Sequence, residues 1–295
     1  MNRPMELDAA RLLARVAEQV PAALRMNVIV IGSIATAWQF RDVSGTASVA
    51  TKDIDLLLRP SVDAVANAET LGNQLMKQGW QPQFPNGRQP GKPDIPEDQL
   101  PVLRLTPPRD DGLWFVELLA EPPPGQTARK HWTRFHTEFG DFVLPSFRFM
   151  RVAVHGADET EFGLRVARPA RMALAHLLEH AEPDRTPISS LRSQPRFLKD
   201  VGRAISLWWL ARQQSTVADS QWLLEWGETI EGIFPGSRTE LAAAAHRGLM
   251  SVADYLRDTH AIAVNGVLAP HQTTLEAWRR AYSGLLELIQ RWAEM

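Results

Sequence analysis

The sequence predicts an α+β fold, in which a mixed sheet with flanking helices at residues 1–166 precedes an all-α helical domain at residues 167–295. Two observations lead to this prediction. Short apolar runs typical of buried strands alternate with helix-compatible segments up to about residue 155. From Pro169 onward the apolar residues recur at helical spacing, and the composition changes near residue 167.

The first half of the chain begins with a helix that Asp8 can cap and that ends at Pro21. A β-branched run at residues 28–31 predicts a buried strand, which passes through Gly32-Ser33 into a helix at 34–40. The following signals predict a strand from Asp53, a helix at about 60–78, a proline-rich loop at 85–101, and strands near 102–106, 113–119 and 139–144.

The last helix is the clearest element of the second half. Thr273 and Glu276 form a capping-box pair at its start. Six apolar residues then recur at alternating spacings of three and four, namely Leu275, Trp278, Tyr282, Leu285, Ile289 and Trp292. Six positions are few for a coiled coil, so the pattern favours a helix facing the core over a dimer seam.

Composition excludes several classes of protein. The formal net charge of −2 argues against a general nucleic-acid coat, and the lack of cysteine excludes disulfides and cysteine-ligated zinc. No apolar run is long enough for a membrane span, and the N-terminus has no apolar export signal. We therefore expect a cytoplasmic protein with no membrane partner.

The most informative segment of the chain is Thr51-Lys52-Asp53-Ile54-Asp55, which three leucines follow. Side chains alternate across a strand, so Asp53 and Asp55 point to one side while Ile54 points into the core. Upstream, the Gly32-Ser33 step leaves backbone N–H groups at the start of a helix, where a phosphate can bind. The two features together predict a metal–nucleotide site, and the alternative is a solvated strand end.

A third carboxylate comes from the predicted strand at 113–119, where Glu117 is the single polar residue of an apolar run. Burying an isolated carboxylate in such a strand lowers folding stability by roughly several kcal/mol unless a cation pairs with it. A metal ion shared with Asp53 and Asp55 would supply the cation. The alternative is that Glu117 faces solvent on a sheet with one exposed face.

The order of these motifs resembles the nucleotidyltransferase superfamily of the DNA polymerase β type. The string from Thr51 to Leu56 is similar to the T-x-D-I-D-L string of stand-alone bacterial members related to AbiE-type abortive-infection toxins. This resemblance implies a nucleotidyltransferase-like sheet, an NTP substrate, and Mg²⁺ or Mn²⁺ held by Asp53, Asp55 and Glu117. It also implies an RNA, protein or small-molecule hydroxyl acceptor and a small neutralising partner protein.

The resemblance extends into the second half, where Lys199 and Asp200 match a K-D-x-x-x-A helix near the nucleotide. Gly32 and Ser33 would bind the phosphates in such a protein, together with this helix. At the position of a usual lysine the chain has His176, and an insertion around residues 42–47 lengthens the gap between Ser33 and Asp53. Lys199 and Asp200 can equally be a surface pair that adds little stability.

Two further patterns compete with this interpretation. His176, Glu179 and His180 spell H-x-x-E-H, the inverted zincin motif, although no third zinc ligand stands out. The middle of the chain is locally basic, with His131, Trp132 and Phe135 interleaved, and either contacts RNA or forms ordinary surface. Its basic residues are Arg129, Lys130, Arg134, Arg148, Arg151, Arg165, Arg168 and Arg171.

Three functional hypotheses follow from the sequence. The first is an active, metal-dependent nucleotidyltransferase that is toxin-like. The second is a catalytically silent nucleotide- or partner-binding protein of the same fold. The third, more remote, is a zinc peptidase that uses the H-x-x-E-H motif. The intact set of Asp53, Asp55 and Glu117 favours the first.

Overall fold

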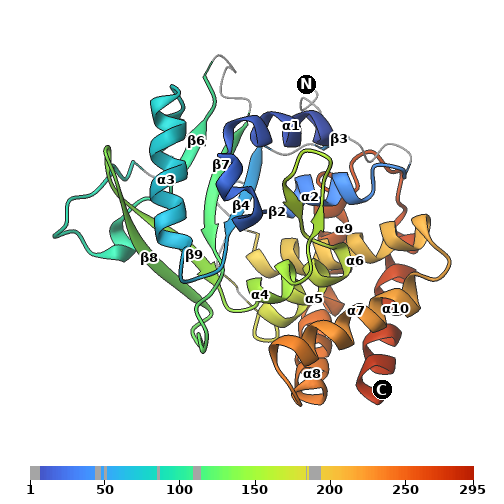
Figure 1. The fold of residues 1–295 in the computed structure, drawn as a ribbon. Helices are drawn as coiled ribbons and strands as arrows, with labels where there is room; N and C mark the ends of the chain where they lie inside the picture. The colour runs from blue at the N-terminus through green and yellow to red at the C-terminus, as the bar shows by residue number, and fades with distance from the viewer. Residues whose placement is uncertain are drawn as a thin grey trace.

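The fold was analysed in a computed structural model, which describes residues 7–43, 48–49, 52–84, 87–108, 114–183, 185 and 194–295. A mixed sheet occupies the first half of the chain, and a helical region forms the second, as the sequence predicts. Figure 1 shows the helices from α5 onward gathered beside the sheet, with the C-terminus at their far end.

The strands of the described residues are short, and most lie in one sheet. They are β1 (Leu7–Asp8), β2 (Val28–Ile31), β3 (Ser48–Val49), β4 (Asp53–Leu58), β5 (Gln81–Pro82), β6 (Arg104–Thr106), β7 (Phe115–Ala120), β8 (Lys130–Thr137), β9 (Gly140–Phe147), β10 (Asp158–Glu159) and β11 (Arg165–Val166). The larger sheet has the order β10-β11-β2-β4-β7-β6-β5, and β1-β3 and β8-β9 form two-stranded sheets.

The helices divide between the two halves of the chain. They are α1 (Ala9–Gln19), α2 (Gly32–Gln39), α3 (Ala64–Lys77), α4 (Met150–Val154), α5 (Pro169–Glu179), α6 (Arg196–Gln214), α7 (Ala218–Ile233), α8 (Arg238–Met250), α9 (Leu256–Val264) and α10 (Leu275–Glu294). No helix of the described ranges combines the length and the apolar character needed to cross a membrane.

The centre of the sheet sets the positions of the predicted site. Strand β4 pairs with β2 in antiparallel and with β7 in parallel orientation, and β6 then pairs with β7 in antiparallel orientation. Residues of β2, β4 and β7 that face the core are fully buried, because short apolar strands in the middle of a sheet are covered on both faces. The polar residues at the start of β4 are therefore brought next to those of β7.

Several predicted elements agree with the structure, with small shifts at their ends. Asp8 caps α1 by accepting a hydrogen bond of 2.7 Å from the Arg11 N–H. Helix α3 begins at Ala64, about one turn later than expected, and Gly79 follows it with φ +90°. The predicted insertion at 42–47 and the motif residue Thr51 lie largely or wholly outside the described residues.

Only one strand of the β8–β9 hairpin was predicted. The sequence patterns indicate a strand near 139–144 but none at 130–137. Strand β8 pairs with β9 along its whole length, from Lys130 opposite Phe147 to Thr137 opposite Gly140. The segment alternates polar and apolar residues, but its histidines and basic residues concealed the strand period. This hairpin packs beside β7 and forms one wall of the central cavity.

The helical region has a core of tryptophans. The rings of Trp208, Trp222, Trp226 and Trp292 contact one another in series at centroid distances of 5.0, 5.7 and 5.4 Å. Buried aromatic residues of this size each contribute about 3–5 kcal/mol when compared with alanine. The apolar stripe of α10 supplies Trp292 to this cluster, so the prediction of a core-facing helix is confirmed.

Two details of the C-terminal half differ from expectation. The capping residue of α10 is Thr274, whose hydroxyl accepts from the Ala277 N–H at 3.1 Å, and not Thr273. The carbonyl of Thr273 instead accepts a hydrogen bond from His260 Nε2 at 2.7 Å. The last strand, β11, ends at Val166 and α5 begins at Pro169, and the buried apolar residues form one cluster across both halves.

Candidate functional site

The β2–α2 turn lies directly against the acidic pair. Ile31, the last residue of β2, is the register partner of Asp55, and α2 begins at the next residue, Gly32. Gly32 has φ +75°, and a Cβ atom there would lie 2.6 Å from Asp55 Oδ2. A glycine is therefore required on two counts, since the backbone is left-handed and the carboxylate approaches too closely for a side chain.

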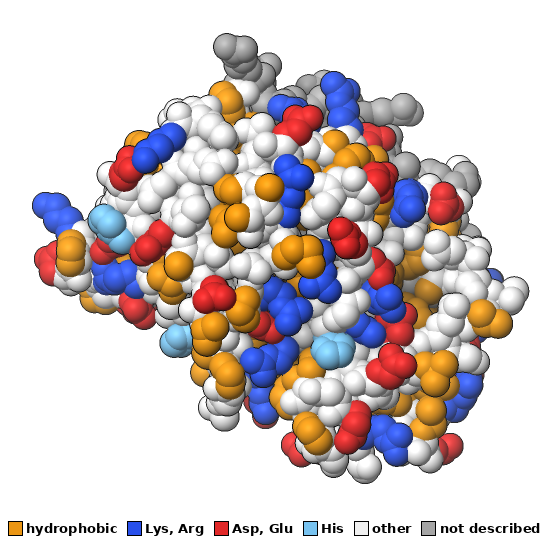
Figure 2. Space-filling view, viewed as in Figure 1, with side chains coloured by type: hydrophobic (Ala, Val, Ile, Leu, Met, Phe, Trp, Pro, Cys, Tyr) orange, Lys and Arg blue, Asp and Glu red, His pale blue; other side chains and the backbone are white. Residues whose placement is uncertain are grey.

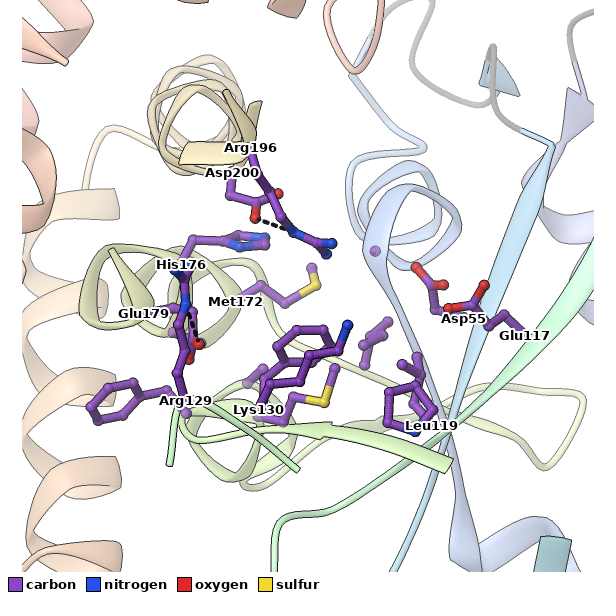
Figure 3. Close-up of a pocket in the computed structure, with 18 of the residues that line it drawn as sticks. Asp55, Glu117, Leu119, Arg129, Lys130, Met172, His176, Glu179, Arg196 and Asp200 are labelled. Atoms are coloured by element: carbon purple, nitrogen blue, oxygen red, sulfur yellow. Dashed lines mark hydrogen bonds and ion pairs between the residues drawn. The ribbon is translucent and has the colours of Figure 1, made fainter. Parts of the chain in front are cut away.

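The three predicted carboxylates come from two neighbouring strands. Asp53 and Asp55 are half-buried at alternate positions of β4, while Ile54 between them is buried. Glu117 on β7 is the register partner of Asp55 in a parallel pair, so both side chains stand on the same face of the sheet. Figure 3 shows Asp55 and Glu117 side by side at one edge of the cavity.

The electrostatics of Asp55 reflect this crowding of negative charge. Burial, together with the negative charges of Asp53 and Glu117, raises the pKa of Asp55 to about 8. Arg203 and Lys199 act in the opposite direction with smaller effect. The surroundings of Asp55 thus favour its protonated form at neutral pH, and an added cation would favour ionisation.

Glu117 has a partner that the sequence did not predict. Arg104 on β6 is its register partner, and Arg104 Nε donates to Glu117 Oε2 at 2.5 Å. Asp55, Glu117 and Arg104 therefore form one row across three adjacent strands. The expected metal counter-charge of Glu117 is supplied in this structure by an arginine.

Asp53, Asp55 and Glu117 are the candidate ligands for a divalent cation. Among the residues that the structure describes, no group of three or more His, Cys, Asp or Glu side chains is arranged to hold a metal ion. Asp53, Asp55 and Glu117 have the oxygen donors that Mg²⁺ prefers and share one face of the sheet. The three carboxylates match the ion in donor type, but they are not gathered around a common point, and Glu117 would have to exchange Arg104 for the ion.

Helix α6 supplies positive charge opposite the β2–α2 turn. Arg203 Nη2 donates to the Ser33 hydroxyl at 3.2 Å, which ties α6 to the first turn of α2. The pKa of Lys199 is lowered, chiefly by Arg203 one helical turn away and then by burial, while Asp200, Asp53 and Asp55 oppose the shift. Like charges at this spacing repel, so the pair is suited to a negatively charged ligand.

Asp200 has a different environment from that of Lys199. Its carboxylate accepts from His180 Nε2 at 3.0 Å and from Arg196 Nε at 3.3 Å. Burial works to raise the pKa of Asp200, but the hydrogen bond from His180 and the nearby positive charges outweigh it and hold that pKa well below its usual value. Asp200 lines the cavity, and its carboxylate is shared between these two partners.

The H-x-x-E-H motif forms a hydrogen-bonded network in this structure. His180 is fully buried, and its Nδ1 atom lies 3.0 Å from Arg129 while its Nε2 atom contacts Asp200. Arg129 also donates to Glu179 at 3.1 Å. Since both ring nitrogens of His180 have protein partners, the motif joins the start of β8 to α5 and α6 and does not resemble an open zinc site.

His176, the first residue of the motif, lies at the cavity wall. The pKa of His176 is lowered to about 3, chiefly by burial and then by Arg203 and Arg196, against the opposing effect of Asp200. The imidazole is therefore neutral at physiological pH. It occupies the position where the resemblance led us to expect a lysine, so the charge of that position is absent from this chain.

Many of these groups border one cavity of ≈ 340 Å³ between the sheet, the β8–β9 hairpin, α5 and α6, whereas Asp53, Ser33, Lys199 and His180 are not part of its lining. Its acidic wall contains Asp55 and Glu117, and its opposite wall contains Lys130 and Arg196 (Figure 3). Apolar side chains such as Leu119, Phe149 and Met172 line the floor between them. The sequence predicted the acidic wall and Gly32, but assigned no role in the site to Arg104, Arg196 or Arg203.

Most of the basic residues in the middle of the chain are held by acidic partners. Arg134 contacts Asp141, Arg151 contacts Glu121, and Arg168 contacts Asp158. Figure 2 shows basic side chains gathered over the region of α4 and α5, with acidic side chains among them. This pairing favours ordinary structural charge over a continuous RNA-binding surface.

The chain was compared with protein-family models, with curated proteins and with solved structures, and none of the three comparisons gave a match. Function is therefore inferred here from the motifs and from the geometry of the cavity.

Proposed function

We propose that the chain is a metal-dependent nucleotidyltransferase, which moves an NMP from an NTP to a hydroxyl acceptor. One observation carries the proposal: Asp55 and Glu117 are register partners at the cavity edge, and Gly32 at the start of α2 lies against Asp55. A helix start, two adjacent carboxylates and facing cations are the groups that a nucleoside triphosphate with its divalent ion requires.

The phosphates would lie between the start of α2 and the cations of α6. The backbone N–H groups at Gly32 and Ser33 bind anionic oxygens, and Arg203 already contacts the Ser33 hydroxyl. Lys199 on the same face of α6 supplies a second positive charge. These groups neutralise the triphosphate and hold its α-phosphorus toward the carboxylate row.

Asp53, Asp55 and Glu117 are the residues that would hold Mg²⁺ or Mn²⁺. When bound, these ions supply charge neutralisation and lower the pKa of the attacking hydroxyl. The acceptor oxygen forms a bond to the α-phosphorus, the bond from that phosphorus to the leaving oxygen breaks, and pyrophosphate departs. The hydroxyl proton passes to a carboxylate of the site and then to solvent, so atoms and charges balance.

One observation favours a second candidate, the catalytically silent binding protein of the same fold. Glu117 is neutralised by Arg104 at 2.5 Å, so the third carboxylate is engaged without a metal ion. If that pair persists when nucleotide binds, the protein binds the triphosphate through α2 and α6 without transferring it. The zinc peptidase has no such support, because His180 is bonded on both nitrogens.

Transfer is tested with the full chain, Mg²⁺ or Mn²⁺, and each NTP labelled in turn at the α- or the γ-phosphate, with cell extract as the source of acceptors. Nucleotidyl transfer attaches the α-label and not the γ-label to RNA, protein or small molecules. Asp55→Asn should abolish the transfer, and Asp63→Asn, at an exposed aspartate outside the cavity, should preserve it.

The remaining outcomes separate the candidates. NTP binding that stabilises the protein against heat without any transfer would favour the silent binding protein. Transfer of the γ-label, or a lack of any NTP-dependent stabilisation, would overturn the proposal.

A further inference from the structure

The wall that faces the carboxylates is built from one face of the β8–β9 hairpin. Lys130 and Trp132 are two residues apart on β8, and their register partners on β9 are Phe147 and Pro145. Because side chains alternate along a strand, these four residues project from the same face. All four line the cavity, so the hairpin presents a mixed aromatic and basic surface to it.

Two cations lie over the rings of this wall. Lys130 Nζ is 3.8 Å from the centroid of the Trp132 ring and 5.3 Å from that of Phe147. The guanidinium carbon of Arg196, at the start of α6, lies 5.3 Å from the Phe147 centroid on the same ring. The faces of aromatic rings attract cations, which holds both charges at the cavity wall.

These cations stand across the cavity from the proposed transfer site. Figure 3 shows Arg196 and Lys130 reaching into the cavity from one side while Asp55 and Glu117 project from the other. The phosphates of the NTP have their own cations in Arg203, which contacts Ser33, and in Lys199 one helical turn away on α6. Lys130 and Arg196 are therefore placed to meet a second anionic group at the opposite end.

We propose that Lys130 and Arg196 form an anion subsite for the acceptor, so that the acceptor is a hydroxyl compound that carries a phosphate or a similar anionic group. This inference rests on the proposed function, because it assigns the far end of the same cavity to the second substrate. The hydroxyl of such a compound would approach the carboxylate row while its anionic group pairs with the two cations. The rings beneath them hold both charges at the wall, and Arg196 contacts Asp200 through its Nε atom.

The test uses inorganic phosphate as the probe. The full chain with Mg²⁺ is saturated with the α,β-methylene analogue of the NTP that stabilises it most, and phosphate is then titrated in by calorimetry. Wild type should bind phosphate without releasing the analogue. The double variant Lys130→Met/Arg196→Met should bind phosphate at least about tenfold more weakly, as expected for lost charged hydrogen bonds, and keep its affinity for the analogue.

Matched controls separate this subsite from general charge effects. Lys92→Met/Arg257→Met removes the same two charge types from exposed positions outside the cavity and should leave phosphate binding unchanged. Lys130→Met alone keeps the pair between Arg196 and Asp200 intact, so it reports on the subsite if the double variant folds poorly.

Each other result overturns one of the two claims. Release of the analogue as phosphate binds would assign Lys130 and Arg196 to the triphosphate and overturn the acceptor subsite. Equal phosphate binding by wild type and the double variant, or none by wild type, would also overturn it. If wild type fails to bind any NTP analogue, the proposed function fails. Phosphate titration of the free protein and the Lys130→Met variant then decides the anion site by itself.

Discussion

Asp55 and Glu117 are register partners on the neighbouring parallel strands β4 and β7, although 62 positions separate them in the chain (117 − 55). Their pairing places two carboxylates on the same face of the sheet, beside the left-handed Gly32. The cost of this arrangement is visible in Asp55, whose pKa is raised to about 8. The relationship makes several consequences measurable.

The pKa of Asp55 predicts that its removal stabilises the ligand-free protein. The folded-state pKa of about 8 lies above the unfolded value of 3.8, so the folded state binds more protons between these pH values. Stability is therefore lost as the pH rises from about 4 through 8. Asp55→Asn should raise the melting temperature at pH 8 and have little effect near pH 4, as measured by calorimetry.

The control for this effect is Asp63→Asn, which changes an exposed aspartate outside the cavity and should leave the pH profile of stability unchanged. An Asp55→Asn variant that is less stable than wild type at pH 8 would contradict the crowding of carboxylates described above.

Replacement of Gly32 should be costly. Gly32→Ala forces an L-residue into φ +75° and places its Cβ 2.6 Å from Asp55 Oδ2. Together these effects should lower the free energy of unfolding by about 1–3 kcal/mol, which urea denaturation can measure. By contrast, Gly227→Ala in α7 meets no atom within 4 Å and should stabilise the protein by about 0.5–1 kcal/mol. Equal effects at the two positions would refute the close approach.

Removal of Arg104 should strengthen the binding of Mg²⁺ in the absence of nucleotide. In Arg104→Gln, Glu117 loses its partner at 2.5 Å, and the site gains one unit of negative charge. For a partly exposed pair worth about 1 kcal/mol, the gain in Mg²⁺ affinity is about fivefold, and calorimetry without nucleotide measures it. Arg257→Gln, at an exposed position, is the charge-matched control. A loss of Mg²⁺ binding would mean instead that Arg104 orients Glu117.

The H-x-x-E-H motif should behave as a structural element. His180→Ala removes the buried ring that contacts both Asp200 and Arg129, while Arg196 and Glu179 remain as their partners, and should cost about 1–3 kcal/mol of stability, measured by chemical denaturation. His176→Ala, at a cavity residue with a neutral ring, should cost less. Metal analysis of the purified protein provides the decisive contrast, because stoichiometric zinc that disappears in His176→Ala would restore the peptidase hypothesis.

The sequence patterns correctly predicted the strands and helices that are determined by residues close together in the chain. The β-branched run ending at Gly32 became β2, and the alternation of Asp53, Ile54 and Asp55 became the polar start of β4. The same holds for the stripe of α10, whose spacing of three and four puts one face in the core. Strand β8 was missed because its inward residues include Lys130, which the alternation of apolar residues does not reveal.

The sequence by itself thus determined which residues share a strand or a helix face, because those relations follow from the backbone period. Only the tertiary structure decided which segments meet. Register set Asp55 beside Glu117 and Glu117 beside Arg104, helix packing set Arg203 against Ser33, and burial made His180 a partner of Asp200. Such contacts join residues far apart in the chain, and their geometry depends on the packing of the whole core.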